Sequence, residues 1–212
     1  MSAKIQLQHF TAVIHNTSRF GLDHDVVHVE NLLATTEPLP EDSSWYVPSE
    51  ANVPDAVREF LRSYNLQPFP IRDNIGTEDI HLLATSGNMD ATIEMCAKAM
   101  LLSTMKNTKL TPIAGSNNLY KLSYDYYLYP DKDGYYELHV QLPFSGLVLN
   151  PSRGRVQVTA LCPIESTIDR VFTKGIDENS QEINEAVTIT QNNVVVNFAY
   201  QLDPLFAIRY RY

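Results

Sequence analysis

The histidines at positions 24 and 28 have the residue type and spacing that could carry metal chemistry. A separation of four places both imidazoles on one face of a helix, and on one face of a strand as well. Imidazole nitrogens with carboxylates close by can bind zinc or a similar ion. A site needs at least one more ligand, which His9 or His15 would have to supply from another strand. The competing interpretation is a polar turn followed by a strand with one exposed histidine.

Motifs for nucleophilic catalysis and for phosphate binding are missing from the sequence. There is no G-x-S-x-G pattern, and the eight glycines are scattered singly, without a G-x-G or GK[ST] sequence. Cys96 falls on the apolar stripe of a predicted helix, which is typical of core packing. Cys162 precedes Pro163 at the end of a predicted strand, with no histidine close in sequence. The sequence therefore favours a protein that is not an enzyme and has no catalytic residue, bound metal or cofactor.

Tyrosine is the unusual residue type of this chain. Six of the twelve tyrosines lie between positions 124 and 136. In a strand, Tyr120, Tyr124 and Tyr126 would share one face, and Tyr127 and Tyr129 the other. One face can pack in the core, whereas the tyrosines on the other face would contact a partner protein or a sugar. The alternative interpretation is that tyrosine is frequent here because it is a favourable residue in β-strands. The residues predicted to contact a partner are Trp45, Tyr46, Tyr126, Tyr127, Tyr129, Tyr135 and Tyr136.

Alternating apolar and polar residues predict a chain that is mostly β-strand. Turn residues recur about every 8 to 12 positions, which is typical of an antiparallel sandwich or barrel. The segment from Pro130 to Gly134 has the composition of a hairpin turn, and Asn192-Asn193 suits a tighter hairpin. The predicted strands include 4–15, 26–33, 79–85, 119–129, 135–142, 185–191, 194–201 and 205–212.

Residues 36–54 differ in character from the segments on either side. Four prolines alternate with acidic residues and serines, which predicts an extended arm because proline fixes φ and removes a backbone donor. Trp45 and Tyr46 lie in its middle, where they could pin the arm onto a neighbouring surface.

Two helices are predicted after this arm, at 54–64 and 89–106. Both segments carry apolar residues at the spacing that places them on one helical face. Asn88 or Ser86 is expected to cap the second helix, because their side chains can accept a hydrogen bond from a free backbone N–H.

The predicted fold class is α+β. At 212 residues the chain can bury a core of ordinary stability without disulfides or metals. Residues 1–111 would hold the N-terminal strands, the arm and the two helices. Residues 112–212 would form an antiparallel β-sandwich of about eight strands, for which a jelly-roll-like arrangement is open.

The formal net charge of −9 at pH 7 disfavours some classes of partner. A field of that sign repels phosphate backbones and anionic lipids, so neither nucleic acid nor membrane is expected as a partner. No stretch of about 18 apolar residues is present, and the N-terminus lacks the apolar core of a signal peptide. We expect the protein to be cytoplasmic at synthesis, with incorporation into a virion or other large particle as a further expectation.

The leading hypothesis for function is a structural, virion-type or capsid-associated subunit. It would act through contacts with other protein subunits, in a homo- or hetero-oligomer. An extended arm usually needs a partner surface, and β-sandwiches are common in shells and fibres, which is an analogy from fold. The first alternative is a carbohydrate- or ligand-binding module that uses the surface tyrosines. The second alternative is a metal-dependent enzyme that uses His24 and His28.

Overall fold

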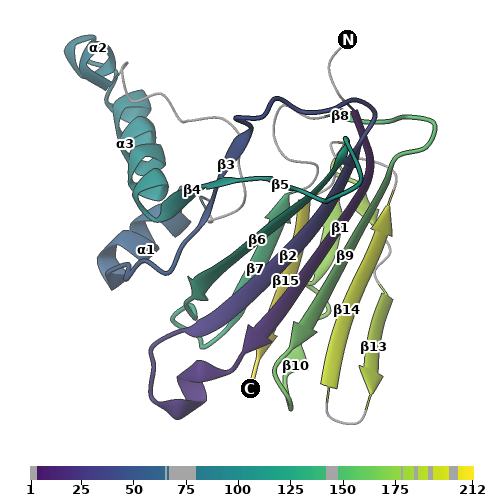
Figure 1. The fold of residues 1–212 in the computed structure, drawn as a ribbon. Coiled ribbons are helices and arrows are strands. Elements are labelled where there is room, and N and C mark those ends of the chain that lie inside the picture. The colour runs from purple at the N-terminus through teal and green to yellow at the C-terminus, as the bar shows by residue number, and fades with distance from the viewer. Residues whose placement is uncertain are drawn as a thin grey trace.

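The computed structural model describes residues 4–64, 66, 80–141, 148–177, 179–183, 186–190, 193–200 and 205–212. Their strands form two sheets and a short two-stranded ribbon, and three α-helices lie beside them (Figure 1). The expected α+β class is confirmed in this coarse form, because the described chain is mostly β-strand with few helices.

The larger sheet has the strand order β13-β14-β9-β1-β2-β6-β5, and β8 also pairs with β1. Within it, β1 runs antiparallel to β2 but parallel to β9. The described strands within residues 112–212 pair antiparallel with one another, as expected, whereas β1 of the N-terminal part runs parallel to β8 and β9. Many residues separate β1 from β9, so no tight turn dictates their relative direction. The strands are β1 (Lys4–His15), β2 (Asp25–Thr35), β5 (Thr111–Pro112), β6 (Leu119–Leu128), β8 (Val148–Leu149), β9 (Arg155–Cys162), β13 (Ala186–Thr190) and β14 (Asn193–Tyr200).

The larger sheet takes strands from both sides of the boundary expected between residues 111 and 112. β1 and β2 precede that boundary and β6 and β9 follow it, yet the four strands are neighbours. The N-terminal strands thus lie inside the sheet to which the C-terminal strands belong. The hairpin predicted near residue 192 is confirmed, since β13 and β14 pair antiparallel.

The smaller sheet is organised around β15 (Leu205–Arg211). This strand pairs antiparallel with β7 (Tyr136–Gln141), β10 (Thr167–Ile168) and β11 (Lys174–Ile176). A final strand, β12 (Glu182–Ile183), pairs with β11. β6 and β7 therefore belong to different sheets, although they are consecutive along the chain.

The hairpin expected between β6 and β7 is wrong, but the turn between them is confirmed. The Asp131 carboxylate accepts hydrogen bonds from the backbone N–H groups of Asp133 and Tyr135, and Gly134 has a φ of 77°. Each strand pairs along its full length with another partner, β2 for β6 and β15 for β7. The turn consequently carries the chain from one sheet to the other.

One hydrophobic core draws side chains from both sheets. On β6, Tyr120, Tyr124 and Tyr126 are buried, whereas Tyr127 is half-buried on the opposite face. The expected division of these tyrosines between two faces is confirmed. The smaller sheet contributes Tyr136, Leu138, Val140, Phe206, Ile208 and Tyr210 to the same core.

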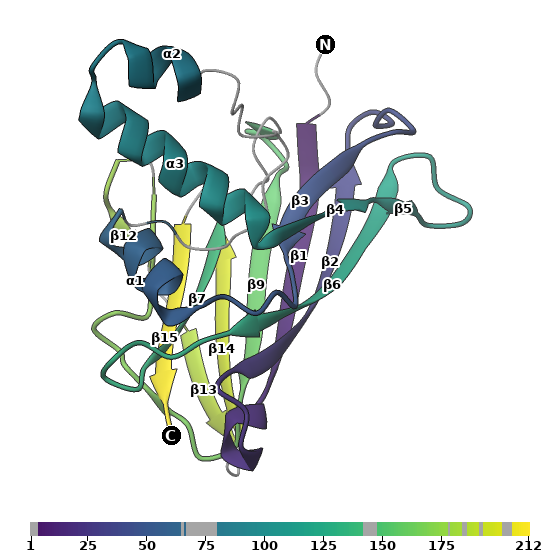
Figure 2. The ribbon, with the colours of Figure 1, turned by 90° about the vertical axis from the view of Figure 1, so that its left-hand side faces the viewer.

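The helices lie beyond a ribbon formed by β3 (Ser44–Pro48) and β4 (Met105–Lys109). Figure 2 shows α1 (Asp55–Ser63), α2 (Ile80–Thr85) and α3 (Met89–Ser103) together on the side of the molecule where β6 and β7 lie. The two predicted helices are confirmed as α1 and α3, and the Asn88 side chain caps α3 by accepting from the N–H of Ala91. None of the helices in the described chain has the length and apolar character that crossing a bilayer requires.

Residues 80–85 form α2, so the strand predicted at 79–85 is wrong. A short apolar run does not distinguish a strand from a buried helical turn, because both periodicities fit it. The Thr85 and Ser86 hydroxyls donate to carbonyl oxygens of the same helix, and α2 packs on α3. The contact with α3 and these local hydrogen bonds favour the helix.

Two buried amide side chains, Gln8 on β1 and Asn31 on β2, have no hydrogen-bond partner among the described residues. Asn31 pairs with Phe10, so Gln8 lies diagonally across from it on the same buried face. A buried polar group without a partner costs about 1–3 kcal/mol. We expect Gln8→Met, which keeps the side-chain length, to raise the free energy of unfolding by about 1 kcal/mol.

Chemical denaturation of the wild type and the Gln8→Met variant measures this gain. Gln157→Met is the matched control, because Gln157 lies half-buried on β9, and its stability should change little. A loss of stability in the Gln8 variant would contradict the prediction.

Candidate partner-binding pocket

A cavity of about 280 Å³ lies between α1, the arm segment 48–53 and the turn that joins β6 to β7. Charged groups from α1 and from the turn region stand on its walls: Arg58, Arg62, Asp131 and Glu137. Four of the seven residues predicted to contact a partner also line it: Tyr126, Tyr127, Tyr129 and Tyr135. The tertiary structure thus gathers most of the predicted contact residues, together with charges, around one hollow.

The arm at 36–54 lies against the chain itself and forms one wall of this pocket. The Leu39 N–H donates to the Tyr120 hydroxyl at 2.8 Å, and the Tyr127 N–H donates to the Ser49 carbonyl at 3.5 Å. The Ser49 hydroxyl donates to the Thr104 carbonyl at 2.7 Å. These contacts remove one reason for expecting the arm to need a partner surface.

Tyr129 is buried beneath the start of α1. Its hydroxyl donates to the Ala51 carbonyl at 3.2 Å and accepts from the Val53 N–H at 3.3 Å. The Arg58 guanidinium lies 4.0 Å from the centre of its ring. Burial raises the pKa of the Tyr129 hydroxyl, so the group remains a neutral donor at physiological pH. Tyr129 therefore joins the arm, α1 and the turn into one wall.

Tyr127 points away from the core, and its ring meets another residue of the same chain. The His24 imidazole stacks on it with ring centres 3.8 Å apart, and the Asp23 carboxylate lies 2.7 Å from His24 Nδ1. The outward tyrosine face, predicted to need a partner, is thus partly covered by His24.

Three of the seven predicted contact residues lie outside the pocket. Trp45 is fully buried in the core, and Tyr136 is buried with its ring stacked on Tyr210 at 5.2 Å. Tyr46 is half-buried on the ribbon, on the face opposite Trp45. Trp45 and Tyr136 pack inside the folded chain, because burial of a large aromatic side chain contributes a large stabilising free energy. For these two residues the structure corrects the expectation of a surface contact.

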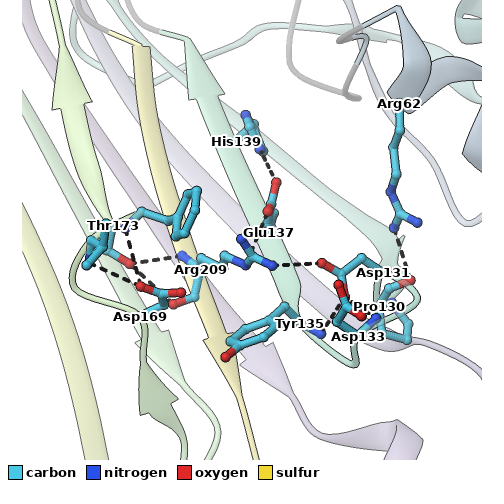
Figure 3. A network of polar contacts seen from close by, with 12 residues as sticks. Arg62, Pro130, Asp131, Asp133, Tyr135, Glu137, His139, Asp169, Thr173 and Arg209 are labelled. Atoms are coloured by element: carbon cyan, nitrogen blue, oxygen red, sulfur yellow. Dashed lines mark hydrogen bonds and ion pairs between the residues drawn. The ribbon is translucent and has the colours of Figure 1, made fainter.

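An ion-pair network holds the base of the pocket (Figure 3). Arg209 of β15 donates from Nη2 to Asp131 at 3.0 Å, and its Nε lies 3.4 Å from Glu137. The His139 ring lies 3.0 Å from the other Glu137 oxygen. Arg209 also lies over the Tyr135 ring, 4.2 Å from its centre. The network fixes both pocket carboxylates and joins the turn to the smaller sheet.

Arg58 and Arg62 of α1 are pocket residues that the sequence analysis did not select. Arg62 donates from Nη2 to the carbonyl oxygens of Tyr129 and Pro130, at 3.3 and 3.0 Å. Arg58 donates to the Val53 carbonyl and forms an ion pair with Asp55. Their spacing of four, beside the apolar stripe of α1, is a sequence signal that places both on one flank of the helix.

The candidate metal ligands occupy different surroundings. His24 is buried against Tyr127 as described, whereas His28 is on the outer face of β2, with its Nδ1 2.7 Å from the Asp125 carboxylate. Within the described ranges, no group of three or more His, Cys, Asp or Glu side chains is placed to hold a metal ion. The structure therefore does not bring His24 and His28 together with a third ligand there.

The environment of the Glu137 carboxylate predicts that the stability of the protein depends on pH. The hydrogen bond from His139, and then the charges of His139, Arg209 and Arg62, hold the pKa of Glu137 below its ordinary value of 4.5, although burial opposes them. The ionised carboxylate therefore contributes stability that is present above the unfolded-state pKa and is lost as pH falls through the folded-state pKa. We expect the stability difference between the wild type and Glu137→Gln to be largest near neutral pH and to shrink below about pH 4.5.

Thermal unfolding of both proteins between neutral and acidic pH measures this difference. Glu59→Gln is the control for loss of a carboxylate, because Glu59 lies on the exposed side of α1. A constant difference for Glu137→Gln would contradict the prediction.

Comparison of the chain with models of known protein families gives no match, and comparison with curated proteins gives none either.

Proposed function

We propose that this chain is a non-enzymatic structural subunit of a larger particle and that it acts through protein–protein contacts at the pocket. The observation that carries the proposal is the gathering of four tyrosines, two arginines and two carboxylates around one hollow. Tyrosine and arginine are enriched among the residues that dominate binding energy at protein interfaces.

The size of the pocket favours a protein contact over a small-molecule ligand. Its volume of about 280 Å³ lies just below the range for small-molecule sites, roughly 300–1,000 Å³. A hollow of this size suits a few side chains of a partner. The mixed polar and aromatic lining is also what an interface anchor requires, since each polar group must find a partner on binding.

Exposed apolar side chains support further contacts between subunits. Phe20 and Val171 are 83% and 74% exposed, in the short helix η1 (Thr17–Phe20) and in the turn after β10. Leu22 and Phe172 beside them are about half exposed. Exposed large apolar residues, when they gather, often mark protein interaction sites.

The particle we propose is a virion shell or a comparable assembly. The two sheets that share one core would form a sandwich, an architecture common in shells. This part of the proposal rests on an analogy of fold, because one fold hosts many functions.

The test is the mass of the protein in solution, measured by light scattering over a wide concentration range. We expect an oligomer whose mass falls to that of the monomer in a Tyr135→Ala variant. Tyr46→Ala is the control, because Tyr46 is a half-buried tyrosine outside the pocket. A wild type that is monomeric at every concentration would contradict self-assembly through this pocket.

A carbohydrate-binding role has weaker support. Sugars bind by stacking on exposed aromatic faces, but the chain already places His24 on Tyr127, Arg58 on Tyr129 and Arg209 on Tyr135. A glycan array on which the wild type binds a sugar and Tyr127→Ala does not would favour the carbohydrate-binding role.

A further inference from the structure

We propose that the pocket recognises a carboxylate on an extended, acidic segment of a partner protein, and that Arg62 is the group that binds this carboxylate. The inference rests on the proposed function, since it names the chemistry of the partner that enters the same pocket.

Most of the charges around the pocket are already matched within the chain. Asp131 and Glu137 are both held by Arg209, and Glu137 is also bonded to His139. Arg58 is paired with Asp55, and its guanidinium covers the Tyr129 ring. Asp131, Glu137 and Arg209 together carry one net negative charge, and the Arg58–Asp55 pair carries none.

Arg62 is the exception among the charged groups of the pocket. It forms no ion pair with a carboxylate in the described part of the chain, and its two hydrogen-bond partners there are carbonyl oxygens, both bonded through Nη2. A guanidinium carries five N–H donors in a rigid fork. The donors on Nη1 and Nε form no hydrogen bond with a described residue. A positive charge whose Nη1 and Nε donors have no partner in the described chain thus stands on the wall of the pocket.

A carboxylate matches this arrangement better than a phosphate does. A single guanidinium binds a carboxylate through two parallel hydrogen bonds. A phosphate carries close to two negative charges, and the Asp131 and Glu137 carboxylates on the same walls would repel it more strongly. A singly charged group placed at Arg62 can accept two hydrogen bonds from this guanidinium, and Asp131 and Glu137 repel it less than they would repel a phosphate.

The position of β7 favours an extended segment. β15 is the strand that pairs with β7, and no other described strand does, so one edge of β7 has no strand partner in the described chain. Glu137 of β7 and Tyr135 just before it line the pocket, and Arg62 reaches toward the same turn from α1 (Figure 3). An extended peptide can add to a strand edge through main-chain hydrogen bonds, while alternate side chains enter neighbouring pockets.

The test is a selection from a phage-displayed library of random nine-residue peptides against the full chain. We expect the selected sequences to share an aspartate or glutamate at one position. The Arg62→Gln substitution should weaken binding of a selected peptide by about tenfold or more, as for loss of a hydrogen bond to a charged group. Changing the acidic residue of the peptide to its amide should weaken binding to the wild type equally, and should cost nothing further in the variant.

Arg153→Gln is the matched control, because it removes one positive charge from an exposed turn outside the pocket. Peptides that lose binding in Tyr135→Ala but lack a shared acidic position would overturn the inference and leave the proposed pocket function standing. Selected peptides that bind Tyr135→Ala as well as the wild type would overturn both. Circular dichroism of each variant shows whether it is folded before binding is measured.

Discussion

Replacing Asp25 with alanine is expected to lower the free energy of unfolding by about 3 kcal/mol. Asp25 begins β2, and its side chain is fully buried at one end of the core. Its carboxylate accepts hydrogen bonds from the N–H and hydroxyl of Ser18, at 3.2 and 2.8 Å. It also accepts from the hydroxyls of Tyr210 and Tyr212, at 2.9 and 2.6 Å. The one side chain thus joins η1, β2 and β15.

The size of this effect follows from what alanine leaves behind. A buried carboxylate is tolerated only because donors surround it, and removing it leaves those donors without a partner. Burial, and then the nearby Asp25 charge, raise the pKa of Tyr210, so its hydroxyl stays protonated and continues to need an acceptor. The Tyr210 side chain is fully buried, so water cannot readily replace the lost oxygen.

Chemical denaturation of Asp25→Ala measures the loss. The control is Asp125→Ala, whose carboxylate is paired with His28 on the outer face of the sheet and is about half exposed. Exposed pairs contribute about 1 kcal/mol or less, so this variant should stay close to the wild type. Equal stability of the two variants would refute the central role given to Asp25.

Trp45→Ala is expected to lower the free energy of unfolding by about 3–5 kcal/mol, the usual cost of emptying a buried aromatic site. Trp45 is fully buried in the core that both sheets share. It belongs to β3, which pairs with β4 and connects the helices to the larger sheet. Loss of the indole should therefore also loosen the arm that forms a wall of the pocket.

Tyr46→Ala is the matched control for this prediction. Tyr46 is the next residue of the same strand, and its side chain lies half-buried on the other face. Both residues were predicted as partner contacts, so the pair separates a core role from a surface role. Denaturation midpoints should differ strongly between the two variants. A Trp45→Ala protein as stable as Tyr46→Ala would place the indole outside the core.

The secondary structure of this chain could largely be predicted from local patterns. The alternation from Tyr120 to Tyr127 gave the correct strand and the correct division of faces, because a pleated strand turns successive side chains to opposite sides. The apolar spacing in α1 and the cap at Asn88 of α3 were equally informative. The failure at residues 80–85 came from a run too short to distinguish the two periodicities.

The candidate site was only half predictable. The tyrosines stand out in the sequence by type and density, and four of them reach the pocket. Arg58 and Arg62 do not stand out, because a charged residue on a helix is usually solvated. They become pocket residues only when α1 is placed beside the turn after β6, and that placement depends on the ribbon that carries the helices.

By itself, the sequence determined most of the strands and helices, though not α2, and which side of each is apolar, since both depend on neighbours a few positions apart. Only the tertiary structure decided that β6 and β7 join different sheets, that β1 and β9 run parallel, and that Asp25 meets Tyr210 and Tyr212. Such contacts depend on which distant faces pack best together. A local pattern shows whether each face of a strand or helix is apolar or polar, but it does not show which distant element packs against that face.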